Sequence, residues 1–178
     1  MSTDVRLRPL SYDDWPAVHA WASLPEACRY QTWGPSTEEE TKAFVKAAVQ
    51  AWEQSPQVRY VHAVEVDGVV VGNGELKILH RTHRQGEISY IVHPRMWGRG
   101  VGTAAGRELL RIGFEELDLH RIVGTCDPRN LGSAAVLRKL GMTYEGHLRH
   151  TQLIRDGWRD SLAFSILDDE WRLARDGD

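Results

Sequence analysis

The chain has 178 residues, of which 42% are hydrophobic and 26% are charged, and its formal net charge is −3 at pH 7. This length and composition are those of one globular domain spanning residues 1–178. The slightly negative charge argues against a nucleic-acid partner, and no apolar run approaches the roughly 20 residues of a membrane span. The start lacks a signal-peptide pattern, and Cys28 and Cys126 stand in no motif spacing, so we expect reduced cysteines and a cytoplasmic location.

The first part of the chain predicts one strand followed by two helices. Residues 5–10, VRLRPL, alternate in polarity as a half-buried strand does. Residues 11–23 favour a helix, and prolines and a glycine interrupt the stretch that follows it. Residues 36–54 predict the clearest helix, because Thr37 and Glu40 have the spacing of a capping box ahead of an amphipathic stretch.

Strands dominate the middle of the sequence. Residues 59–66 and 69–79 predict two strands, and the Asp67-Gly68 pair between them is typical of a type I′ hairpin turn. Residues 86–92, GEISYIV, predict a third strand. The remaining predicted elements are a helix at 102–117, a strand at 120–126, a helix at 130–141 and two further β runs. This order predicts a mixed α/β (α+β) fold whose sheet is antiparallel at first and contains a parallel crossover later.

A glycine-rich turn precedes the helix predicted at 102–117. Glycines alternate at positions 98, 100 and 102, so backbone N–H groups free of side-chain bulk converge with the positive end of a helix, which favours a phosphate. Residues 100–105 also satisfy the dinucleotide fingerprint G-x-G-x-x-G/A. That alternative is disfavoured because the turn lies past mid-chain, after an antiparallel meander. A P-loop is excluded because no Gly-Lys-Ser/Thr follows the glycines.

Together with two later motifs, this turn resembles the GNAT superfamily of N-acetyltransferases, in the RimJ/RimL-like branch of ribosomal-protein N-acetyltransferases. Residues 97–102, WGRGVG, resemble the family's Arg/Gln-x-x-Gly-x-Gly/Ala motif, with Trp97 in place of the first residue. Residues 130–146, NLGSAAVLRKLGMTYEG, and 157–171, GWRDSLAFSILDDEW, resemble the branch's closing helix and strands. The resemblance implies a GNAT fold in which two central strands splay apart.

The resemblance also implies acetyl-coenzyme A as co-substrate, with no metal. Its pyrophosphate is expected at the glycine turn, its pantetheine arm along the preceding strand, and Asn130 beside that arm. The residues expected at the pyrophosphate are Gly98, Arg99, Gly100, Val101, Gly102 and Thr103. The backbone expected to pair with pantetheine is that of Ile91, Val92 and His93.

The expected chemistry is direct transfer of an acetyl group to a primary amine. Glu87 matches the family's usual base, whereas the tyrosine that many members use as the acid is Leu137 here. Ser133, at the branch's serine position, is the expected donor at the thiol, with helix capping as its alternative role. Cys126 has no activating group placed beside it by the sequence, so an acyl-enzyme is disfavoured.

The acceptor is left open between a protein N-terminus and a small-molecule amine. Tyr30 and Trp33 lie in the segment that overhangs the acceptor site of this fold, so we expect them to shape that site. His80 and His83 lack a third ligand, which argues against zinc. The branch commonly forms homodimers, and a homodimer is therefore an expectation here. A non-catalytic sensor of acyl-coenzyme A is the alternative to an enzyme.

Overall fold

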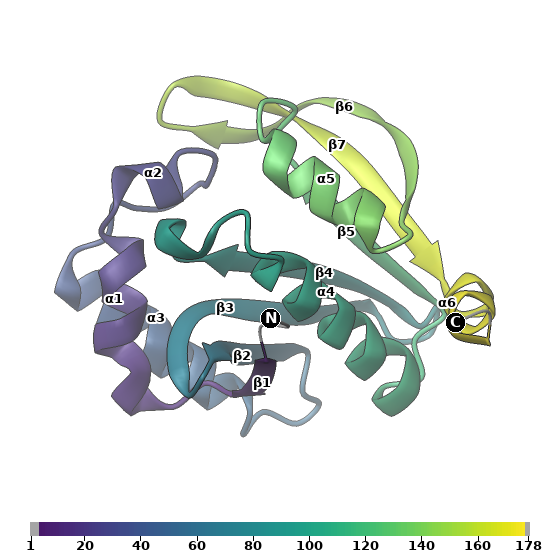
Figure 1. The fold of residues 1–178 in the computed structure, drawn as a ribbon, viewed down its shortest axis with the longest axis horizontal. Coiled ribbons are helices and arrows are strands. Elements are labelled where there is room, and N and C mark those ends of the chain that lie inside the picture. The colour runs from purple at the N-terminus through teal and green to yellow at the C-terminus, as the bar shows by residue number, and fades with distance from the viewer. Residues whose placement is uncertain (1–3, 177–178) are drawn as a thin grey trace.

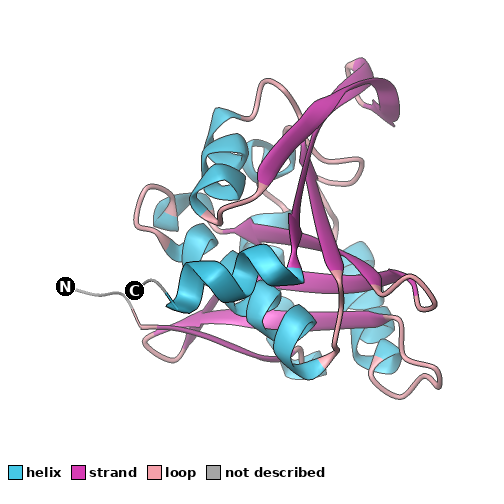
Figure 2. Ribbon diagram, turned by 90° about the vertical axis from the view of Figure 1, so that its right-hand side faces the viewer, coloured by secondary structure: helices cyan, strands magenta, loops and turns pink. Residues whose placement is uncertain are grey.

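The computed structural model describes residues 4–176, which form one seven-stranded sheet with helices on both faces (Figures 1 and 2). The strands lie in the order β1-β2-β3-β4-β5-β7-β6. They are β1 Val5–Pro9, β2 Arg59–Val66, β3 Val69–His80, β4 Gln85–Val92, β5 Arg121–Cys126, β6 Thr143–Ile154 and β7 Gly157–Leu167. The α-helices are α1 Trp15–Ala22, α2 Pro25–Cys28, α3 Glu38–Ala51, α4 Val101–Arg111, α5 Leu131–Lys139 and α6 Asp168–Asp176. Two 3₁₀ turns, η1 Tyr12–Asp14 and η2 Pro94–Met96, precede α1 and α4.

Local signals place the first elements as the sequence predicts. The Thr37 hydroxyl accepts the Glu40 N–H at 3.2 Å and the Glu40 carboxylate accepts the Thr37 N–H at 2.8 Å, so the capping box forms at the start of α3. Asp67 and Gly68 adopt φ values of 51° and 77°, as a type I′ turn requires, and they join β2 to β3. None of the helices formed by residues 4–176 is long and apolar enough to cross a membrane.

The helix predicted at 102–117 is regular over α4 alone. Its last turn, Ile112–Glu116, widens into a π-helix, labelled η3. Gly113 lies in this turn, and a Cβ there would come within 2.4 Å of the Ile122 side chain on β5. The close approach of helix to sheet at Gly113 therefore leaves no room for a side chain.

Separate clusters of buried residues hold the helices on the two faces of the sheet. Val18 and Trp21 of α1 pack with Val45 of α3 against Val61 and Ala63 of β2. The opposite face carries α4 and α5, whose buried residues Leu109, Leu110 and Leu137 pack against Leu76 and Ile122. Each face thus has its own helices, and a ligand that reaches both must pass through the sheet.

The sheet opens between β4 and β5. All its other neighbouring strands are antiparallel, whereas β4 and β5 are parallel and pair at Gln85, Gly86 and Glu87. Beyond Glu87 the two strands, every residue of which is described, pair no further, and Figure 1 shows β5 diverging from β4. The predicted splay is therefore present, and the backbone of Ile88–Val92 faces a gap on that side.

Candidate active site

The glycine turn opens directly into α4. Gly98 and Gly100 adopt φ values of 73° and 81°, in the left-handed region that side chains disfavour, and Gly100 is the N-cap of the helix. A Cβ built on either residue meets no atom within 4 Å, so the space beside the turn is open. The first helical bond runs from the Ala104 N–H to the Gly100 carbonyl, and the earlier N–H groups of the helix are available to an anion. Together with the exposed Arg99, this turn fits a pyrophosphate group.

Trp97 replaces the family's Arg or Gln and takes a different role. Its indole N–H donates to the Val92 carbonyl at 2.8 Å, although the ring is 55% exposed. This bond fastens the glycine turn to the end of β4. The side-chain contact to phosphate that Arg or Gln would make is therefore replaced by a contact that shapes the turn.

The backbone of β4 is divided between β3 and the gap. The His93 N–H donates to the Val71 carbonyl at 2.7 Å, so it faces β3 and is not free to pair with a ligand in the gap. Because backbone groups alternate along a strand, those of Tyr90 and Val92 face the gap and those of Ile91 face β3. Among the three residues expected along pantetheine, Val92 is therefore the one whose N–H is directed into the gap.

The start of α5 brings Asn130 and Ser133 to the same gap. The Asn130 side chain accepts the Ser133 N–H at 3.0 Å, so Asn130 is the N-cap of the helix. The Ser133 hydroxyl is thereby released from capping and lies 3.5 Å from the Tyr90 hydroxyl. Burial raises the pKa of the Tyr90 phenol to about 12, while the Ser133 contact acts in the opposite direction. The sequence reasoning missed Tyr90, because its proximity to Ser133 depends on how β4 and α5 pack.

Cys126 lies at the end of β5, in the core beneath α5. Burial raises the pKa of its thiol, and the positive charge of Arg159 only partly opposes this. An acyl-enzyme nucleophile needs the opposite shift, toward the thiolate. The burial of Cys126 therefore argues against an acyl-enzyme formed on this residue.

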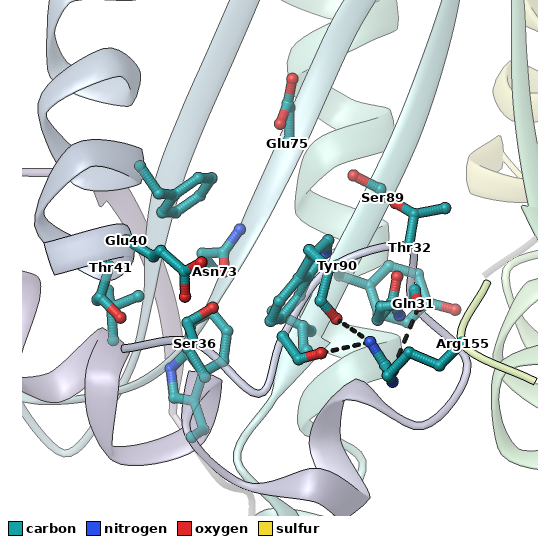
Figure 3. Close-up of a pocket in the computed structure, with 17 residues that line it drawn as sticks. Gln31, Thr32, Ser36, Glu40, Thr41, Asn73, Glu75, Ser89, Tyr90 and Arg155 are labelled. Atoms are coloured by element: carbon teal, nitrogen blue, oxygen red, sulfur yellow. Dashed lines mark hydrogen bonds between the residues drawn. The ribbon is translucent and has the colours of Figure 1, made fainter. Parts of the chain in front are cut away.

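A cavity of about 660 Å³ lies on the other side of the gap, against the face that carries α1 and α3 (Figure 3). Figure 3 shows Glu40, Thr41 and Asn73 on one side of it, with Gln31 and Arg155 on the other. Its walls are lined by Val18, Trp21, Ala22, Gln31, Thr32, Trp33, Gly34, Ser36, Glu40, Thr41, Phe44, Asn73, Glu75, Ser89, Tyr90, Ile91 and Arg155. The size is that of a small-molecule site, and its walls combine aromatic rings with two carboxylates and the guanidinium of Arg155.

The two residues expected to shape the acceptor site differ in their placement. Trp33 lines the cavity and packs edge-on against Trp21, with ring centroids 6.0 Å apart. Tyr30 is not among the lining residues; its ring lies beneath the guanidinium of Arg129, 5.6 Å from the ring centroid. Of the two, Trp33 is therefore the one that contacts the cavity.

Three carboxylates lie on this side of the gap. Glu40 lines the cavity while capping α3, and Glu75 lines it while accepting two bonds from Arg59 at 2.7 and 3.0 Å. Glu87 lies one pleat further along β4 from Ser89, on the same sheet face, at the last position before the splay. Burial raises the pKa of Glu87, and Lys77 on β3 partly opposes that rise. A carboxyl with this shift is suited to accept a proton near neutral pH.

Buried polar groups in the cavity wall add to these acids. The Asn73 side-chain oxygen is buried and has no hydrogen-bond partner within residues 4–176, and Asn73 is 8% exposed. An amine N–H could satisfy this oxygen. His80 and His83 lie at the β3–β4 turn and are not among the residues that line the cavity, and no cluster of three metal-binding side chains occurs in the described part of the chain. Sequence alone singled out neither Asn73 nor Glu75.

Comparison with known proteins agrees with this architecture. The sequence model of the acetyltransferase (GNAT) domain family matches residues 4–143. The chain is 31% identical to the spermidine N(1)-acetyltransferase of Escherichia coli K12 over 171 residues, covering 94% of this chain and 88% of that protein. It is 30% identical to YnaD, an N-acetyltransferase of Bacillus subtilis, over 166 residues, covering 93% and 94% of the two chains.

The fold is also that of a solved enzyme of the RimL type. The structure of RimL, a ribosomal L7/L12 alpha-N-protein acetyltransferase bound to coenzyme A, superimposes with a TM-score of 0.83. The two chains are 18% identical, and the match covers 96% of this chain and 97% of RimL. With a splayed sheet, a glycine turn at the start of α4 and a family model matched over residues 4–143, the chain belongs to the GNAT family of acetyltransferases, as a RimJ/RimL-like N-acetyltransferase.

Proposed function

We propose that this protein transfers an acetyl group from acetyl-coenzyme A to a primary amine on a small cationic molecule, without a metal. The observation that carries the proposal is the gap between β4 and β5, which separates the glycine turn at the start of α4 from a cavity lined by Glu40 and Glu75. The two reactants would enter from opposite faces of the sheet and meet at the gap. This arrangement supports direct transfer while both are bound.

The residues around the gap match the demands of the reaction. Acetyl-coenzyme A supplies a thioester whose carbonyl carbon is attacked by the amine nitrogen as the C–S bond breaks. In the proposal, Glu87 receives the proton that the amine loses, through a water molecule, and the Val92 N–H donates to the carbonyl oxygen as its negative charge grows. Ser133 and Tyr90 donate hydrogen bonds to the departing thiolate, a role supported by the proximity of their hydroxyl groups. Gly98–Thr103 hold the pyrophosphate, and Asn130 lies beside the pantetheine arm.

The acceptor class follows from the cavity. Carboxylates and aromatic rings attract an ammonium group, and about 660 Å³ accommodates a small linear amine. The E. coli relative named for spermidine supports this choice. A protein N-terminus, the acceptor class named for RimL, is the alternative that the same chemistry allows.

The proposal is tested in two steps. Thermal unfolding should shift upward with acetyl-coenzyme A and with coenzyme A but not with NADH, by an amount that grows with ligand concentration above Kd. Release of coenzyme A thiol is then followed with spermidine and with a peptide that has a free N-terminus. Turnover of spermidine supports the proposal, and turnover of the peptide alone replaces the small amine with a protein acceptor. Stabilisation by coenzyme A without turnover of any amine would favour a sensor, and stabilisation by NADH alone would favour the dinucleotide alternative.

A further inference from the structure

Residues 31–34 line the acceptor cavity, and the β6–β7 hairpin holds the segment 28–34 that contains them. Figure 1 shows the tip of this hairpin reaching over α2. Arg155, at the tip, donates to the carbonyls of Cys28, Gln31, Trp33 and Gly34, at 3.4 Å for Gln31 and 2.9 Å for Trp33.

A second arginine of the same hairpin reaches the same segment. Arg159, on β7, donates to the Tyr30 carbonyl at 2.5 Å and is itself 7% exposed. The carbonyls thus held by the two arginines are those of Cys28, Tyr30, Gln31, Trp33 and Gly34. The segment lies between α2 and α3 and has no regular secondary structure over residues 31–37, so these side chains replace the hydrogen bonds that a helix or strand would supply.

The hydrogen bonds of Arg155 show that its side chain holds the cavity wall and leaves few donors for a ligand. Nη1 donates to Trp33 and Gly34, and Nη2 donates to Cys28 and Gln31. A guanidinium has four N–H bonds on these two nitrogens, so only its Nε–H is left for another acceptor. The charge of Arg155 lies at the cavity, yet its donors are directed at the protein backbone.

The hairpin tip is anchored on its other side to the coenzyme-binding half of the site. Asp156 accepts from Arg129 at 2.8 Å, and Arg129 also donates to Asp127 at 2.7 and 3.0 Å. The Asp127 side chain is 1% exposed and lies in the β5–α5 loop that leads to Asn130. The tip therefore bridges the loop at the start of α5 and the wall of the acceptor cavity.

We propose that Arg155 is a positioning residue for the acceptor: it holds the segment 28–34 and so closes the cavity wall at residues 31–34, so that Trp33 faces the bound amine. The proposal rests on the function proposed above and adds to it the element that shapes the amine site. The segment 28–34 is tightly packed against itself, since a Cβ on Gly34 would come within 2.4 Å of the Cys28 sulfur. Loss of the arginine should therefore loosen the wall without disturbing the glycine turn, which lies on the opposite face of the sheet.

The variant Arg155→Met tests the proposal with two readouts. Amide hydrogen exchange over residues 28–36 should speed up at least tenfold, with no change over residues 98–110. KM for spermidine should rise at least tenfold, while KM for acetyl-coenzyme A and kcat at saturating amine stay within threefold. Arg155→Lys keeps the charge but cannot donate in a planar fork, so its KM for spermidine should lie between those of the wild type and Arg155→Met.

Arg149→Met is the matched control, because Arg149 lies on the same hairpin, is exposed, and its side chain forms no hydrogen bond or ion pair with any residue among 4–176. If Arg155→Met does not fold, Asp156→Ala, which removes the carboxylate that accepts from Arg129, should still raise KM for spermidine. Unchanged exchange over 28–36 overturns the proposal, as does faster exchange with an unchanged KM for spermidine. If the wild type acetylates neither spermidine nor the peptide, the proposed function fails and the acceptor role of Arg155 fails with it. Unchanged exchange alongside full wild-type turnover overturns only the inference about Arg155.

Discussion

Glu87 offers the sharpest test of the proposed chemistry, because one substitution should change activity and stability in opposite directions. Glu87→Gln keeps the size and polarity of the side chain but removes the carboxylate that would accept the amine proton. General-base catalysis contributes about 10²- to 10⁴-fold, so kcat should fall by that factor, which corresponds to about 2.7–5.4 kcal/mol in the barrier. Turnover of spermidine at saturating acetyl-coenzyme A measures this fall.

The pH dependence follows from the raised pKa of Glu87. The base acts as the carboxylate, so wild-type kcat should decline as pH falls through that pKa, at a pH above the ordinary value of 4.5. This decline should be missing from the pH profile of Glu87→Gln. Glu75→Gln is the matched control, since Glu75 lines the cavity and is paired with Arg59. It should raise KM for the cationic amine and keep the wild-type decline.

Stability provides the second half of the same prediction. A carboxyl whose folded pKa is raised stabilises the folded state fully below its unfolded pKa, and this contribution is lost as pH rises through the folded pKa. Burying the Glu87 carboxylate therefore costs stability at pH 8, and Glu87→Gln, which is always neutral, should have the higher Tm there. At pH 4 the two proteins should unfold at similar temperatures. A variant that retains the wild-type pH profile, or that is less stable than the wild type at pH 8, would refute this reasoning about Glu87.

Three further predictions concern the coenzyme side of the gap. Gly100→Ala should weaken coenzyme A binding and lower the free energy of unfolding by about 1–2 kcal/mol, because the left-handed φ of 81° is strained for alanine. Isothermal titration measures the affinity and chemical unfolding measures the stability. Wild-type affinity for coenzyme A would contradict the proposed pyrophosphate site at the glycine turn. Tyr90→Phe and Ser133→Ala should each lower kcat about tenfold or more, with little change in KM for the amine. If both hydroxyl groups act on one thiolate, the fall in kcat of the double variant should be smaller than the product of the two single falls. Cys126→Ser should retain the wild-type kcat within a few-fold. Loss of turnover in this variant, together with an acetyl-cysteine trapped in the wild type, would instead support an acyl-enzyme mechanism.

The parts of the fold that were predictable from sequence are those fixed by neighbouring residues. The capping box at Thr37, the Asp67-Gly68 turn and the glycine turn before α4 each depend on the conformation of a few adjacent positions. Local rules describe such positions well, because the turn or cap is specified where it occurs. The same reasoning placed α4 but not its π-helical end, which depends on the contact between Gly113 and β5.

The candidate site was less predictable because its members meet across long stretches of sequence. Tyr90 approaches Ser133, Glu75 enters the cavity beside Ser89, and Arg155 holds a segment more than 120 residues earlier in the chain. Periodicity shows which face of a strand a residue occupies, but it does not show which loop will cover that face. The roles of Glu87 and Ser133 in catalysis stay predictions, since position and chemistry support them without a measured reaction.

In the proposed reaction, the opening of the sheet would allow the glycine turn and the cavity to bring their two ligands together. The glycine turn and the start of α4 lie on one face, where N–H groups and an arginine favour the negative phosphates. The cavity with Glu40 and Glu75 lies on the other face, where carboxylates favour a positive amine. A fully paired β4 and β5 would keep these opposite charge preferences apart, with a layer of backbone hydrogen bonds between them. Because pairing stops at Glu87, the reactants would meet where the strands part, and the carboxyl at that position is the one whose pKa burial has raised.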